Sequence, residues 1–116
     1  MSIAERHKYF VNTLYGIELD SFAREVARYS LILADYPNPD GWQIEEADIF
    51  TSPIFDQYLK KANIVLCNPP FGQFSDNERT GYSNLRAANK AIEAILRVLE
   101  YPPQMLGFVL RNVSTV

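Results

Sequence analysis

Blocks of apolar residues recur along this chain with two different periods, and they predict four helices alternating with four strands. The strand-like blocks are short and rich in β-branched or aromatic residues, and they cover residues 13–19, 42–45, 64–67 and 105–113. The helix-like blocks are longer and cover residues 1–11, 22–35, 53–61 and 85–99. A strict alternation of helix and strand predicts an α/β fold, mainly a parallel sheet with flanking helices.

The apolar positions within two of these helices predict which face each one presents. In the second helix, capped by Asp20 or Ser21, they share spacings of four, three and four and are Phe22, Val26, Tyr29 and Leu33. In the last helix they are Leu85, Ala88, Ile92, Ile95, Leu96 and Leu99. Glu93 and Arg97 are four residues apart, so we expect them to pair on the outer face of the last helix. The polar residues 72–84 have no apolar period and predict a long loop.

Composition narrows the possible classes of function. The chain has 116 residues, 47% of them hydrophobic, which fits one small domain spanning residues 1–116. A net charge of −3 gives no sign of a phosphate-binding surface. With one cysteine and one histidine, neither an intramolecular disulfide nor a histidine or thiolate metal site is expected. Without a membrane span or an apolar leader, we expect a cytoplasmic protein.

The stretch VLCNPPFG, residues 65–72, carries the candidate chemistry. Two prolines end the buried strand because neither can donate to the strand ladder, so the next residues lie at the carboxyl edge of the sheet, where such sheets bind ligands. The Asn68 side chain and the Pro69 carbonyl, fixed by Pro70, could accept from the two hydrogens of a planar amine. Phe71 could stack on the ring that bears this amine. Alternatively, the stretch is a rigid exit from the strand with a buried phenylalanine.

In this position NPPF resembles the catalytic motif of amino-methylating DNA methyltransferases, particularly the N6-adenine class. LYGIELD resembles the second strand of that family, which implies that Glu18 binds the ribose hydroxyls of S-adenosylmethionine. ADIF resembles the third motif, which implies that Asp48 accepts from the cofactor's adenine amine beside Ile49. Read alone, Glu18 could be a solvated charge and Asp48 a turn residue. ARYSLILADYP is most similar to restriction-modification methylases of type I and the fused type II kind.

The chain departs from this family in its first motif, a strand that ends in a glycine-rich turn. No Gly-x-Gly occurs anywhere in the sequence. We therefore expect a partial Rossmann-like methyltransferase domain that alone binds S-adenosylmethionine weakly or not at all and is inactive. DNA would be the partner of the full-length enzyme. The alternatives are a methyltransferase for RNA bases or for protein glutamine, and an inactive remnant or interaction module.

The absent first strand has a consequence for assembly. In the order of the family's sheet it lies between the strand of Ile17 and the strand of Val65, and its absence leaves two hydrogen-bonding edges open. We expect these two strands to pair directly, or a second copy of the chain or a complementing polypeptide to supply a strand.

Overall fold

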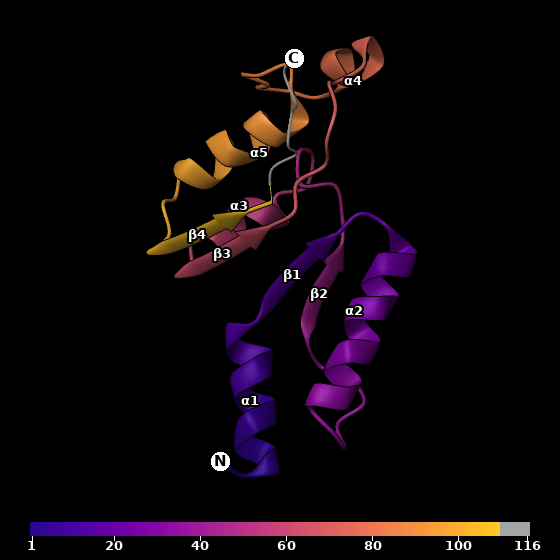
Figure 1. Ribbon diagram of the computed structural model, residues 1–116, viewed down its shortest axis with the longest axis vertical. Helices are drawn as coiled ribbons and strands as arrows, with labels where there is room; N and C mark the ends of the chain where they lie inside the picture. The colour runs from indigo at the N-terminus through magenta and orange to yellow at the C-terminus, as the bar shows by residue number, and fades with distance from the viewer. Residues whose placement is uncertain (110–116) are drawn as a thin grey trace, which may run out of the picture. The chain divides into compact units, whose positions relative to one another are not determined.

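The computed structural model describes residues 1–109 and consists of two compact units, Met1–Ile49 and a second that begins at Phe50 (Figure 1). The described residues contain five helices and four strands. The strands form two two-stranded parallel sheets, β1 with β2 and β3 with β4. The α/β class and the parallel pairing are confirmed, although the strands are divided between two sheets.

The first unit is built from two helix–strand pairs. Its elements are α1 (Ile3–Thr13), β1 (Tyr15–Glu18), α2 (Ser21–Ala34) and β2 (Gln43–Glu46). Asp20 caps α2 as expected, because its carboxylate accepts from the backbone N–H of Phe22 at 3.0 Å. The register of the sheet runs from Tyr15 opposite Gln43 to Glu18 opposite Glu46, so both strands end at the same edge.

The predicted apolar face of α2 exists, and it is exposed. Phe22 is 76% and Leu33 is 80% exposed, whereas Ala27 and Leu31 on the opposite side of the helix are half-buried. Ala23 and Ile32 are half-buried as well, so the spacing of the large apolar residues did not decide which side of α2 is covered.

A fully buried carboxylate, Asp35, joins the two ends of the first unit. Its oxygens accept from His7 Nδ1 at 2.6 Å, from Trp42 Nε1 at 2.9 Å and from Arg6 Nε at 3.3 Å. Burial alone would raise the pKa of Asp35, but the hydrogen bonds from His7, Trp42 and Arg6 outweigh it and hold this pKa below the ordinary value. An ionised carboxylate only accepts, so Nδ1 of His7 carries the hydrogen.

Gly41 makes room for this cluster. Its φ is +107°, and a Cβ at this position would lie 3.3 Å from the His7 ring. The conformation and the close approach both favour glycine, the residue without a Cβ. A local backbone requirement therefore keeps Trp42 and His7 beside Asp35.

The second unit contains one more helix than the sequence predicted. Its elements are α3 (Ile54–Leu59), β3 (Ile64–Cys67), α4 (Asp76–Gly81), α5 (Lys90–Leu99) and β4 (Met105–Phe108). Helix α4 lies inside the stretch expected to be a loop, and a capping box between Ser75 and Glu78 explains its formation. Residues 110–113 of the predicted last strand lie outside the described residues.

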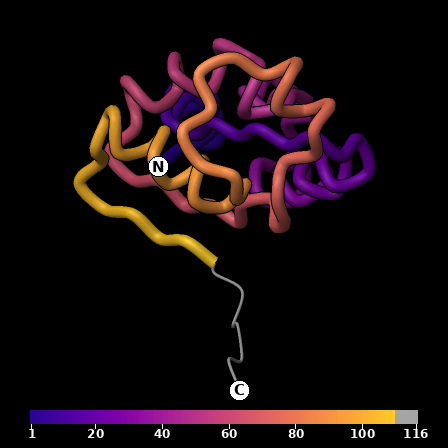
Figure 2. Tube along the Cα trace, turned by 90° about the horizontal axis from the view of Figure 1, so that it is seen from above, coloured from indigo at the N-terminus to yellow at the C-terminus, as the bar shows by residue number. Residues whose placement is uncertain are grey.

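The buried apolar side chains of the core all belong, among the described residues, to the second unit, whose path can be followed in Figure 2. They are Phe50, Phe55, Tyr58, Leu59, Phe74, Ala91, Ala94 and Val98. The sequence predicted that residues 64–67 form a buried strand, and this is wrong for one of its faces, since Ile64 is 61% and Leu66 is 84% exposed. Side chains alternate along a strand, so one face of this sheet is covered while the other is open.

The predicted face of the last helix is also wrong. Helix α5 begins at Lys90, and its buried residues are Ala91, Glu93, Ala94 and Val98. Ile92 and Leu99, which belong to the predicted stripe, are each 52% exposed. The helix is rotated because alanines allow close packing and because the buried carboxylate of Glu93 is fully hydrogen-bonded, as described below.

Asp35→Asn is expected to lower the free energy of unfolding of the chain at neutral pH. The pKa of Asp35 is lower in the folded chain than in the unfolded chain, where it is near 3.8. The stability that Asp35 contributes is therefore present at pH values above 3.8 and is lost as pH falls through the pKa of the folded chain. Urea unfolding followed by the fluorescence of Trp42, the only tryptophan, measures the difference at each pH. The exposed Asp40→Asn is the control, and a difference independent of pH would contradict this role.

Candidate functional site

The carboxyl edge of the first sheet holds the residues expected to bind a cofactor. Glu18 is the last residue of β1, and its carbonyl accepts from the N–H of Ala47 at 3.1 Å. Asp48 and Ile49 follow directly and lead into a turn. The structure thus brings Glu18 and the segment 47–49 together at one edge, as the pairing of parallel strands requires.

The Glu18 carboxylate is held in place by the start of α2. It is half-buried, and its Oε1 accepts from the N–H of Asp20 at 3.1 Å. Asp20 in turn caps α2. A carboxylate fixed in this way at the end of a parallel strand can accept from hydroxyl groups of a ligand.

The candidate amine-binding residues follow β3 in the second unit. The ladder with β4 continues one residue past the strand, where the N–H of Val109 donates to the Cys67 carbonyl at 3.0 Å. The chain then leaves the sheet with Asn68 exposed, Pro69 buried and Phe71 37% exposed. The side chains of Asn68 and Phe71 are therefore accessible at the carboxyl edge, and the orientation of the Pro69 carbonyl stays a prediction.

The segment after Phe71 is a closed loop, which we call the 72–90 loop. Its two ends pair with each other, because the N–H of Lys90 donates to the Gly72 carbonyl and the N–H of Phe74 donates to the Ala88 carbonyl, each at 2.9 Å. Lys90 also pairs with Glu78 at 3.1 Å. Since Gly72 follows Phe71 directly, these bonds place the whole loop beside the candidate motif.

Three aromatic rings support the base of this loop. Phe74 packs edge-on against Phe50, with ring centroids 5.0 Å apart, and against Tyr82 at 5.8 Å. Such pairs contribute about 0.5–1.5 kcal/mol beyond the area they bury. The long polar stretch of the sequence is thus an ordered structure held by one aromatic cluster.

Comparison with models of known protein families shows which family the chain belongs to. A family model described as N-6 DNA Methylase matches residues 3–95, which include every candidate site residue. The chain belongs to this family. No curated protein and no solved structure matches it significantly. The resemblance inferred from NPPF, LYGIELD and ADIF is therefore confirmed at the level of the family, and the role of each residue stays a prediction.

In this member of the N-6 DNA Methylase family, sequence reasoning missed the buried Glu93. Its Oε2 accepts from the N–H groups of Arg86 at 3.0 Å and Ala87 at 3.1 Å, and its Oε1 accepts from Arg97 Nε at 3.3 Å. The predicted pair with Arg97 exists, but Glu93 is fully buried rather than on the outer face. The four-residue spacing was the available signal, and it could not distinguish a buried pair from an exposed one.

Arg97 extends this network to the segment that follows the candidate cofactor residues. Its Nη1 donates to the Phe50 carbonyl at 3.0 Å, and its guanidinium carbon lies 5.3 Å from the centre of the Phe50 ring. Glu93 and Arg97 thus connect Phe50, the first residue of the second unit, with Arg86 and Ala87 of the 72–90 loop.

No group of three or more potential metal-ligating side chains occurs in residues 1–109. Within the same residues, no helix combines the length and apolar character required to cross a bilayer.

Cys67, next to Asn68, is expected to react slowly with alkylating reagents. Burial raises the pKa of its thiol to about 11, from an ordinary 9.0, which lowers the thiolate fraction at pH 8 by roughly 100-fold. The rate of alkylation by iodoacetamide should therefore keep rising up to about pH 11. The guanidinium-unfolded chain, with the same single thiol, is the control, and equal rates at pH 8 would contradict this expectation.

Proposed function

We propose that the chain is the amine-binding part of an S-adenosylmethionine-dependent DNA methyltransferase that methylates the N6 amine of adenine. The observation that carries this proposal is the Asn-Pro-Pro-Phe sequence at the carboxyl end of a parallel strand in a member of the N-6 DNA Methylase family. Adenine inside a duplex is out of reach, so the target base is flipped out of the stack to reach these residues.

The exposed side chains after β3 suit a flipped adenine. The amide oxygen of Asn68 and the carbonyl of Pro69 accept from the two hydrogens on N6. Phe71, 37% exposed, stacks on the base and contributes about 1–3 kcal/mol to binding. These contacts fix the amine and orient its lone pair, and orientation supplies much of the rate in such a transfer.

The residues of the first sheet edge fit the nucleoside end of the cofactor. The Glu18 carboxylate, anchored through the Asp20 amide, accepts from the ribose hydroxyls. Asp48 accepts from the adenine amine of the cofactor, and Ile49 lies beside that ring. Without a Gly-x-Gly turn in the sequence, these contacts hold only the nucleoside portion, so binding is weak.

The reaction balances without a strong general base. S-adenosylmethionine supplies a methyl group bonded to a positively charged sulfur. The N6 lone pair forms a bond to the methyl carbon while the carbon–sulfur bond breaks, and its electron pair stays on sulfur. The methylated nitrogen then releases one proton to water. Asn68 keeps N6 in line with the breaking bond and accepts from its hydrogens throughout.

Asn68→Ala is expected to abolish methyl transfer to adenine. The test supplies the chain with radiolabelled S-adenosylmethionine, adenine-containing duplex DNA and a polypeptide that carries a glycine-rich strand and turn. Loss of the amide removes an acceptor that holds N6, so the rate should fall by roughly 100-fold or more. Asn63→Ala is the matched control, because Asn63 is an exposed asparagine at the opposite end of β3.

The same assay separates this function from the alternatives. Transfer to RNA or to a glutamine peptide in preference to DNA would replace adenine in DNA as the substrate. No transfer to any of the three would favour an inactive remnant or an interaction module. An equal effect of both asparagine variants would argue against a specific role for Asn68.

Glu18→Gln is expected to weaken the already weak binding of S-adenosylmethionine by about tenfold, because it replaces a charge-assisted hydrogen bond by a neutral one. Amide NMR shifts of the chain, titrated with the cofactor to millimolar concentration, measure this affinity and should move at Glu18 and Asp48. Glu5→Gln in the first turn of α1 removes the same charge elsewhere. Micromolar binding by the unmodified chain would contradict the expected weakness.

A further inference from the structure

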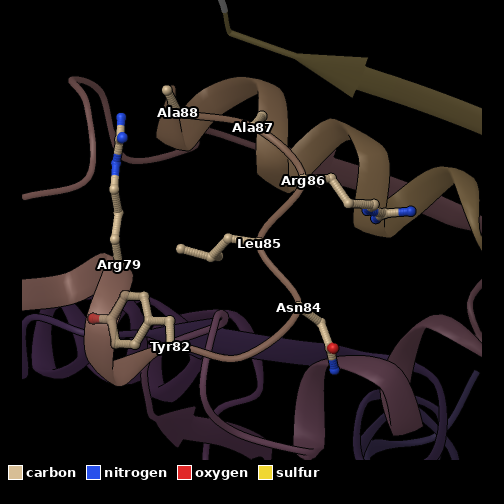
Figure 3. Close-up of a pocket in the computed structure, with 7 residues that line it drawn as sticks. All are labelled: Arg79, Tyr82, Asn84, Leu85, Arg86, Ala87 and Ala88. Atoms are coloured by element: carbon tan, nitrogen blue, oxygen red, sulfur yellow. The ribbon is translucent and has the colours of Figure 1, made fainter. Parts of the chain in front are cut away.

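The second half of the 72–90 loop lines a hollow that the proposed adenine and cofactor contacts leave unused. Its volume is about 440 Å³, which lies in the range of small-molecule sites. The lining residues come from the end of α4 and from the irregular segment that follows it. They are Arg79, Tyr82, Asn84, Leu85, Arg86, Ala87 and Ala88. Figure 3 shows Leu85 pointing towards the space between Arg79 and Tyr82, whereas Arg86 points away.

Arg79 differs from the other arginines of residues 1–109. Each of the others has a carboxylate partner, and they are Arg6, Arg24, Arg28, Arg86 and Arg97. The guanidinium of Arg79 makes no ion pair or side-chain hydrogen bond within that part of the chain, and it stands at one side of the hollow (Figure 3). A planar group with five donors that is left without an acceptor suits an oxyanion such as phosphate.

The wall opposite Arg79 is rigid. Glu93, fully buried, accepts from the backbone N–H groups of Arg86 and Ala87 and so holds this segment against α5. Asn84 has a φ of +63°, and this left-handed residue turns the chain into the wall. A hollow with one fixed wall can position a bound group, which a free loop could not do.

The local charge also favours an anion, although the whole chain has a net charge of −3. None of the residues that line the hollow is acidic. The nearby carboxylates of Glu78 and Glu100 are neutralised by Lys90 at 3.1 Å and by Arg86 at 2.9 Å. Asp76, in the first turn of α4, does not line the hollow and has no ion pair within residues 1–109. Among the lining residues, Arg79 is the cation without a carboxylate partner.

We propose that this hollow binds a backbone phosphate of the DNA strand that carries the target adenine, with Arg79 as the contact. The loop begins directly after Phe71 and its ends are paired at Gly72 and Lys90, so the hollow belongs to the segment that follows the proposed adenine-binding residues. This inference rests on the proposed function, and it adds a phosphate contact outside the adenine and cofactor sites.

The salt dependence of DNA binding tests this contact. Fluorescence anisotropy with an adenine-containing duplex gives the slope of log K against log salt for the full chain. The slope is negative, and one lost phosphate contact reduces its magnitude by roughly 0.9. Arg79→Gln should show this smaller magnitude, and Arg79→Lys should keep most of the original one. Lys8→Gln, an exposed cation in α1, removes the same charge elsewhere and should leave the slope unchanged.

The outcomes separate this proposal from the proposed function. An unchanged slope in Arg79→Gln, or no DNA binding at the lowest salt, overturns the phosphate contact even if Asn68-dependent methylation is observed. A slope of smaller magnitude in Arg79→Gln, without methylation by the unmodified chain, supports the contact and counts against the proposed function. If inorganic phosphate, and not DNA, shifts the Nε–H resonance of Arg79, the hollow binds a free anion and the proposal is wrong.

Discussion

The buried carboxylate of Glu93 is the interaction on which the second unit depends. Removing an ionised group from water costs several kcal/mol unless its oxygens are hydrogen-bonded, and here three donors satisfy them. Two of these donors are backbone groups of the 72–90 loop, and the third, Arg97, also holds the Phe50 carbonyl. One side chain therefore fixes the rotation of α5, the wall of the hollow and the start of the unit, so the segments around the candidate motif are positioned together.

The first unit follows the same principle with Asp35. This carboxylate is also fully buried, and it joins the start of α1 through His7 to the start of β2 through Trp42. No apolar side chain of the first unit is among the fully buried ones of residues 1–109. A unit with so little apolar burial gains less from the hydrophobic effect, so a satisfied polar network carries more of its specific geometry.

Sequence reasoning succeeded where a residue's effect is local and failed where burial is set by tertiary contacts. The Pro-Pro pair ends β3 and Asp20 starts α2 because each acts on its own backbone, and both were predicted. The order of the candidate residues, each after a strand, followed from the same local signals. The outer-face position predicted for Glu93 was wrong because a four-residue spacing does not show whether a pair is buried. The apolar spacing of α2 likewise defined a face without showing that Leu33 on it is exposed. Helix α4 was missed since its capping box stands in a polar stretch without an apolar period.

Net charge gave a similarly incomplete view of partners. A sum of −3 averages over the chain, whereas binding depends on the field within about one Debye length, roughly 10 Å at moderate salt. Glu78 of the 72–90 loop is paired with Lys90, and Glu100 beyond the loop is paired with Arg86, so the fields of these two carboxylates are largely cancelled at short range. Asp76, in the first turn of α4, has no ion pair within residues 1–109. Among the residues that line the hollow, Arg79 is the cation without a carboxylate partner. An acidic protein can thus present a cation where the chemistry of a nucleic acid would require one, and pairing rather than composition decides where that cation lies.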